Sequence, residues 1–258
     1  MGGKENPFFA KALVNRYWKH FFKRGLVEPE DDIRDTNPPT NPEPLAALEK
    51  HFVQSGFDLK ELVRIITRSS TYQLGSEPNE HNLVDTQNFS RFQPRRLQAE
   101  VLLDSIDQLT GSRTSFADLP EGTRAVALPD NSYNKSSAFL QVFGRPDGAS
   151  VCECERVTSP SLAQSLHLMN GSDVRSKLSG SSGRAAALAK DPRSNPEKVA
   201  EIYLAAFARK PNAPELKTAL SYIEGPISDA NGNQVSDRQK LEDLLWALIN
   251  TKEFLFNH

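Results

Sequence analysis

The sequence predicts a mainly α-helical fold, in which two helix clusters are joined by a long irregular segment and there is little or no sheet. Apolar residues recur every three or four positions in several segments, which is the spacing of a helix with one buried face. Residues that start or stop helices bound these segments. We therefore expect an N-terminal helical subdomain over residues 1–111, an irregular segment over 112–158 and a C-terminal helical subdomain over 159–258, which could also form one compact domain.

The first predicted helix starts at Asn6-Pro7, because asparagine caps helices and proline is tolerated in the first turn. Its apolar stripe recurs every four residues at Phe9, Leu13, Tyr17 and Phe21. Gly25 is expected to end this helix in the left-handed conformation.

Residues 26–44 are rich in proline and acidic residues, so an ordered loop is expected there. Asn41 is expected to cap the second helix, which ends near Gly56. Asp58 and Glu61 then have the spacing of a capping box for the third helix.

A fourth helix is expected to open at Pro94 and to stop at Gly111. In the irregular segment, residues 124–128 are a candidate for a short extended stretch, and residues 137–143 are a candidate for a short helix.

Helical signals return after Cys154. The expected starts of the later helices are Ser159-Pro160, Asn195-Pro196, Pro214 and Ser236. The first of these helices carries Leu162, Leu166 and Met169 on one side.

Charge and composition exclude several classes of function. Lys and Arg number 31 against 33 Asp and Glu, a net charge of −2, so we expect no nucleic-acid partner. No apolar run approaches the roughly 20 residues of a transmembrane helix. The N-terminus shows no export signal and leads directly into a helix, so we expect the parent gene to continue upstream of Met1. No Cys-x-x-Cys-His motif is present, so we expect no haem in this chain.

Acidic residues gather at positions 28–35, here called the acidic arm, and Asp31 and Asp32 could supply oxygen ligands for calcium or magnesium. The arm lacks the glycine-centred spacing of a calcium loop, so solvated or helix-capping carboxylates are the favoured interpretation. Arg95 and Arg96 could bind a substrate carboxylate, but structural ion pairs are favoured.

The densest local motif is Cys152, Glu153, Cys154, Glu155 and Arg156. Two thiols at this spacing could share a soft metal, and Arg156 would favour the thiolate. Zinc would require two more ligands, and the histidine nearest in sequence is His167. We favour packed cysteines that hold the irregular segment against the helix beginning at Pro160. Glycine-rich phosphate loops and the common hydrolase motifs are absent.

Several stretches together resemble the planctomycete family called domain of unknown function 1553. They are residues 6–10, 14–18, 22–27, 31–39, 70–73, 94–97, 152–156 and 252–258. The resemblance implies the C-terminal part of an exported, extracytoplasmic protein with a cytochrome-c-like domain upstream. Haem would then lie on that upstream domain, and the partners of this chain would be the upstream domains of the same protein.

Two functions remain open at this stage. One is a non-catalytic helical domain that docks against other domains of its parent protein. The alternative is an enzyme or substrate-binding domain with a cleft between the helix clusters, which converging Asp, Arg, Cys and His side chains would favour. The sequence leaves the substrate, any metal and the oligomeric state open.

Overall fold

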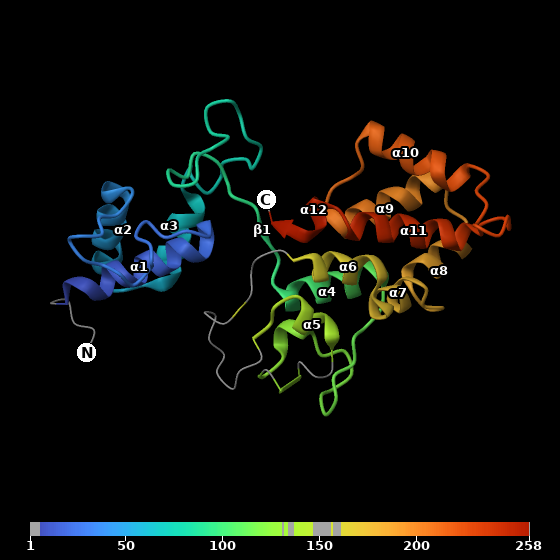
Figure 1. Ribbon diagram of the computed structural model, residues 1–258, viewed down its shortest axis with the longest axis horizontal. Coiled ribbons are helices and arrows are strands. Elements are labelled where there is room, and N and C mark those ends of the chain that lie inside the picture. The colour runs from blue at the N-terminus through green and yellow to red at the C-terminus, as the bar shows by residue number, and fades with distance from the viewer. Residues whose placement is uncertain (1–5, 131, 134–136, 147–155, 157–160, 258) are drawn as a thin grey trace. The chain divides into compact units, whose positions relative to one another are not determined.

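The computed structural model describes residues 6–130, 132–133, 137–146, 156 and 161–257. The chain divides into two compact units, Met1–Arg95 with His258, and Arg96–Asn257. The described residues confirm the predicted fold class, because helices dominate both units and the sheet consists of two strands of two residues each (Figure 1). The domain limits predicted near residues 111 and 158 stay a prediction, and the division into units falls elsewhere, between Arg95 and Arg96.

The first unit is built on α1 (Pro7–Phe22), α2 (Pro42–Gln54) and α3 (Leu59–Arg68). Their apolar faces meet in one core. In α1 the buried positions are Ala10, Val14, Trp18 and Phe22. The expected stripe lies beside them and is only partly buried, and its first member, Phe9, is 38% exposed. The most completely buried side chains of this core are Val14, Leu26, Leu45, Phe52, Leu62 and Ile66.

Helix α1 starts as predicted, with the Asn6 side chain accepting hydrogen bonds from the amides of Phe8 and Phe9. Its predicted end is wrong, because Lys23 takes the left-handed conformation, with φ of 69°. Glycine is needed at position 25 for another reason, which is the close approach of the Val27 carbonyl oxygen. A Cβ at this position would lie 2.5 Å from the Val27 carbonyl oxygen.

The starts of α2 and α3 differ in their capping. Asn41 precedes α2, but its side chain makes no capping hydrogen bond, so that part of the prediction is wrong. Asp58 caps α3 as predicted, accepting from the amides of Lys60 and Glu61 at 2.8 and 3.1 Å.

The acidic arm is fixed to α1 by Asn15, which is fully buried. The Asn15 side-chain amide donates to the carbonyls of Val27 and Glu30 at 2.9 Å each, and its oxygen accepts from the Val27 amide at 3.0 Å. The Asn37 side-chain amide also bonds to the arm, donating to the carbonyls of Glu28 and Asp32. Three backbone groups near the start of the arm therefore depend on one buried amide.

The second unit contains a longer series of elements. In chain order these are β1 (Arg95–Arg96, starting at the unit boundary), α4 (Ala99–Thr110), the 3-10 helix η1 (Ala125–Ala127), α5 (Ala138–Val142), α6 (Leu162–Asn170), α7 (Ser172–Leu178), α8 (Arg184–Lys190), α9 (Asn195–Phe207), α10 (Ala213–Glu224), α11 (Asp237–Ile249), α12 (Lys252–Leu255) and β2 (Phe256–Asn257). One core joins α4, the segment after it and the later helices, and its fully buried members include Leu102, Ile106, Phe139, Val199 and Leu245.

Two predictions in this region are wrong. The helix expected from Pro94 begins only at Ala99, because Arg95 and Arg96 are extended and pair with β2. The stretch 124–128 holds η1 instead of an extended segment, since the Asp104 carboxylate gathers the amides of Ala125 and Val126 in one turn. The short helix predicted at 137–143 is confirmed as α5.

Helices α10 and α11 share a buried lysine. Lys240, on α11, donates from its ammonium group to the carbonyls of Ile223 and Gly225 at 2.9 and 2.8 Å. These carbonyls lie at the end of α10, where the last carbonyl oxygens have no N–H donors within the helix. The Lys240 side chain of α11 thus caps the C-terminal end of α10. None of the helices within the described residues has the length and apolar character needed to cross a membrane.

Candidate functional site

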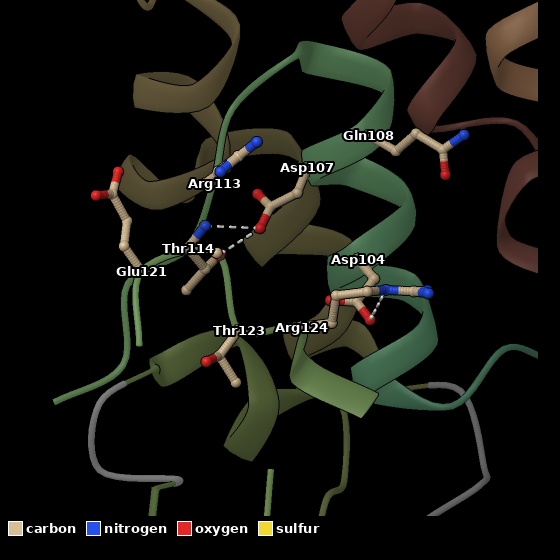
Figure 2. A pocket seen from close by; sticks show the side chains of 9 residues that line it. Asp104, Asp107, Gln108, Arg113, Thr114, Glu121, Thr123 and Arg124 are labelled. Carbon is tan, nitrogen blue, oxygen red and sulfur yellow. Dashed lines mark hydrogen bonds and ion pairs between the residues drawn. The ribbon is translucent and has the colours of Figure 1, made fainter. Parts of the chain in front are cut away.

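A polar site in the described residues lies on α4. Asp104 and Asp107 are three residues apart on this helix, so they lie on neighbouring turns, and Gln108 follows Asp107. Residues 112–126, here called the α4 loop, leave the helix and return to it, and the two aspartates hold the ends of this loop (Figure 2).

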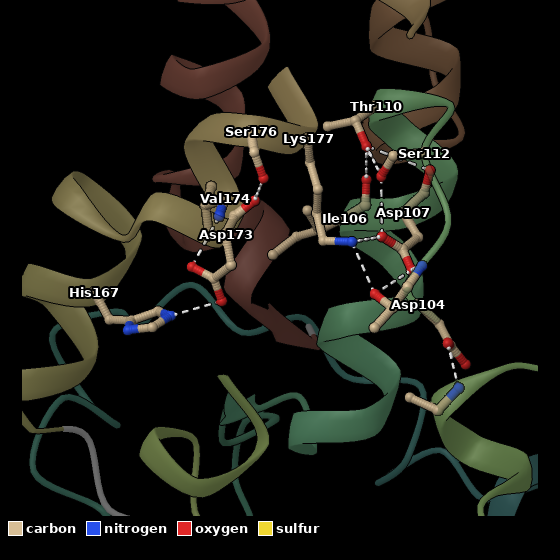
Figure 3. Close-up of polar contacts among 12 residues, drawn as sticks. Asp104, Ile106, Asp107, Thr110, Ser112, His167, Asp173, Val174, Ser176 and Lys177 are labelled. Carbon is tan, nitrogen blue, oxygen red and sulfur yellow. Dashed lines mark hydrogen bonds and ion pairs between the residues drawn. The ribbon is translucent and has the colours of Figure 1, made fainter. Parts of the chain in front are cut away.

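Asp107 holds the first end. Its carboxylate accepts from the amide and the hydroxyl of Thr114, both at 2.7 Å, and from the Ser112 hydroxyl at 3.0 Å. The ammonium group of Lys177, on α7, lies against the same carboxylate and donates to the Thr114 hydroxyl at 2.8 Å (Figure 3). The mostly buried Lys177 therefore compensates the charge of Asp107.

Asp104 holds the second end. It accepts from the amide of Ala125 at 2.7 Å and from that of Val126 at 3.3 Å, and it pairs with the Arg124 guanidinium at 3.3 Å. Two side chains of the loop, Phe116 and Ala125, are buried in the core below. The loop is therefore fixed at both ends and supported from beneath.

A polar pocket of about 450 Å³ lies between α4 and this loop. Its lining consists of Asp104, Asp107, Gln108, Arg113, Thr114, Glu121, Gly122, Thr123 and Arg124. Gly122 has φ of +83°, and a Cβ there would lie 3.1 Å from Nη1 of Arg113. Glycine at this position therefore permits both the turn and the approach of the guanidinium.

A second cluster, of buried charges, surrounds Glu100 in the first turn of α4. Its carboxylate pairs with Arg156 at 2.8 Å and 3.1 Å and with Arg145 at 3.1 Å. Burial alone would raise the pKa of Glu100, but the hydrogen bonds and charges of the arginines hold it below its ordinary value. Arg145 also donates to the Asp130 carbonyl at 3.0 Å, so the cluster ties α4 to two loops.

Arg96 belongs to the surroundings of this cluster. It donates to the Phe143 carbonyl at 3.0 Å, and its guanidinium lies 5.4 Å from the centre of the Phe143 ring. Burial and the charge of Arg156 lower the pKa of the Arg96 guanidinium. The structure thus brings together two of the predicted site residues, Arg96 and Arg156.

The other predicted residues are spread over the described chain. Arg95 donates to the His20 carbonyl. Asp31 pairs with Arg16 at 2.6 Å and Asp32 pairs with Arg34 at 2.9 Å.

His167 on α6 pairs with Asp173 on α7 at 3.0 Å (Figure 3). Its ring also contacts the stacked rings of Phe139 and Phe143. Cys152, Glu153, Cys154 and Glu155 lie outside the described residues, so the predicted packing role of the cysteines stays a prediction. In the part of the chain that the structure describes, no three His, Cys, Asp or Glu side chains are placed to hold a metal ion.

Sequence reasoning missed Glu100, Arg145 and the carboxylates of the pocket. Asp104 and Asp107 carry a weak signal, since two carboxylates three residues apart lie on neighbouring positions of one helix. Their partners in the α4 loop and on α7 are distant in sequence, so pattern alone could not have found them.

Helix α6 exposes an apolar surface that the sequence pattern placed on one side of the helix. Leu162, Leu166 and Met169 are 76%, 50% and 53% exposed and form what is called here the α6 face. The opposite side faces the core through Leu168 and Gln164, whose amide donates to the Val142 carbonyl at 3.1 Å. The helix therefore turns uncharged side chains both inward and outward.

Comparison with known proteins gives one match. The model of the family PSD1, described as protein of unknown function (DUF1553), matches residues 1–223. No curated protein and no solved structure matches the chain. The family match stops within α10, although α11 and α12 beyond it contribute Leu245, Ile249 and Phe254 to the same core.

Proposed function

Since the chain belongs to the DUF1553 family, which is described as having unknown function, we propose that it serves as a docking module of a larger extracytoplasmic, haem-associated protein. Its partner in this proposal is an upstream domain of the same polypeptide, and any haem lies on that domain. The proposal rests on the exposed apolar side chains of the α6 face.

The composition of α6 supports a permanent contact. Leu162–Asn170 contains no Asp, Glu, Lys or Arg, and three of its larger apolar side chains stand in water. The centres of protein interfaces are depleted of charged residues and enriched in methionine. Positions 162, 166 and 169 follow the i, i+4, i+7 spacing with which a helix fills an apolar groove.

The proposal predicts that Leu166→Glu weakens docking and leaves the fold of this chain intact. The binding of this chain to the rest of the parent polypeptide, measured by isothermal titration calorimetry, should weaken at least about tenfold. The melting temperature of the chain alone should not fall, because residue 166 is half exposed.

Leu204→Glu is the control, since Leu204 is an exposed leucine on α9 with a similar exposed fraction, 47%. Equal binding by the wild-type chain and the Leu166→Glu variant would contradict the proposal. Self-association of the isolated chain that this variant removes would contradict it too, because the face would then bind a second copy.

A second candidate function, an enzyme or substrate-binding domain, is favoured by the polar pocket on α4. Pockets of several hundred Å³ with fixed polar groups are the usual sites of small ligands. A test that separates the two functions is whether substitutions of pocket residues alter docking, which the docking proposal does not expect.

A further inference from the structure

We propose that the pocket on α4 binds a small zwitterion, such as a free amino acid or a short peptide. Arg113 would receive the carboxylate of this ligand and Glu121 its ammonium group. This site is independent of the α6 face and of the docking proposal.

The pocket is preorganised. Asp104 and Asp107 fix the two ends of the α4 loop through backbone amides, and Lys177 compensates the charge of Asp107 from beneath. These groups are occupied by the protein itself, so they shape the pocket without being available to a ligand. A loop fixed in this way loses little conformational entropy when a ligand binds.

The groups that remain available have opposite charges. Within the described residues, Arg113 and Glu121 make no ion pair and no side-chain hydrogen bond, although both line the pocket. The guanidinium of Arg113 lies over Gly122, which adjoins Glu121 in sequence. A cation and an anion thus line the same pocket, and neither is paired within the part of the chain that the structure describes.

The balance of charge favours a zwitterion over an anion. Together with the neighbouring Lys177, the site contains three cationic groups, on Arg113, Arg124 and Lys177. It also contains three carboxylates, on Asp104, Asp107 and Glu121. A simple anion would gain the guanidinium of Arg113 but would face the Glu121 carboxylate. A ligand with both charges satisfies both side chains, and Gln108 offers an amide to its backbone.

The experiment uses three related probes with the purified chain. Glycylglycine carries both charges, N-acetylglycine only the carboxylate and glycinamide only the ammonium group. Amide NMR spectra recorded during titration should show saturable shifts in residues 113–124 with glycylglycine, with a dissociation constant on the order of 1 mM. The two singly charged probes should bind at least about tenfold more weakly.

Arg113→Gln and Glu121→Gln should each weaken glycylglycine binding at least about tenfold. Both side chains are solvent-exposed, so the spectra should otherwise match those of the folded wild-type chain. Arg175→Gln is the control, because Arg175 is an exposed arginine on α7 outside the pocket.

Three results would overturn the inference. They are the absence of saturable shifts with glycylglycine, equal binding of N-acetylglycine, and unchanged binding by the Arg113→Gln variant. None of these results bears on docking through α6, so the two proposals fail separately.

Discussion

The acidic arm and the α4 loop are both irregular segments held by polar side chains of the helix before them, but they are held at different points. Asn15 bonds to the backbone near the start of the arm, at Val27 and Glu30. Asn37 adds a hydrogen bond to the carbonyl of Glu28. Asp107 and Asp104 accept hydrogen bonds from backbone amides of the α4 loop only near its two ends, at Thr114 and Ala125. The comparison shows that anchoring at the ends leaves room between loop and helix, and this room is the pocket.

Removing the anchor of the arm should have the largest effect. Asn15→Ala leaves two carbonyls and one amide without their buried partner, so the first unit should lose about 3 kcal/mol in its free energy of unfolding. Denaturant unfolding followed by the fluorescence of Trp18 measures this in a Trp246→Phe background, since the second tryptophan of the chain lies in the second unit. Asn41→Ala serves as the control, since that side chain makes no capping bond. A loss equal to that of the control would show that Asn15 does not anchor the arm.

Removing one anchor of the α4 loop should cost less, because the other end stays fixed. Asp107→Asn removes the charge that Lys177 faces and weakens the bonds to Thr114, so about 2 kcal/mol is expected. The loop should also become more sensitive to limited proteolysis between residues 115 and 124.

Asp118→Asn is the control for this experiment, because Asp118 is exposed and tolerates a positive φ equally well as asparagine. If cleavage increased equally in both variants, the idea that Asp107 fixes the loop would fail.

The smallest expected effect is the share of the acid sensitivity that comes from the ion pairs of the arm. Hydrogen bonds from Lys19 lower the pKa of Glu30, and those from Arg16 lower the pKa of Asp31. The stabilisation is present above the ordinary carboxyl pKa and is lost as the pH falls through the lowered values. Because both side chains are largely exposed, the change should stay below about 1 kcal/mol.

The measurement is the melting temperature of the chain as a function of pH, compared with that of Glu30→Gln/Asp31→Asn. The double variant should show a weaker acid dependence, whereas Asp35→Asn should follow the wild-type chain. Identical curves for the double variant and the wild-type chain would exclude these ion pairs as a source of acid sensitivity.

Most of the helical framework was predictable because its signals are local. Asn6, Asp58 and Ser236 accept hydrogen bonds from amides two or three residues later, so sequence alone identifies them as caps. The helix end predicted at Gly25 is wrong because the role of this glycine depends on its close approach to Val27 and Asn15, which no capping rule contains.

The candidate site was less predictable, because its partners are far apart in sequence. Lys177 reaches Asp107 across 70 residues, and Arg156 reaches Glu100 across 56. The predicted stripe on α6 was visible as a pattern, but periodicity does not distinguish a face turned to the core from one turned to water.

The C-terminal end of α10 depends on α11, because Lys240 of α11 supplies the hydrogen-bond donor for its last carbonyls. The carbonyls of Ile223 and Gly225 receive their donor only when α11 has docked and brought Lys240 to them. Local fraying of α10 would therefore leave the buried ammonium group of Lys240 without its carbonyl acceptors, which is costly. Opening of either helix is thereby coupled to opening of the other, and hydrogen exchange should report the two as a single cooperative unit.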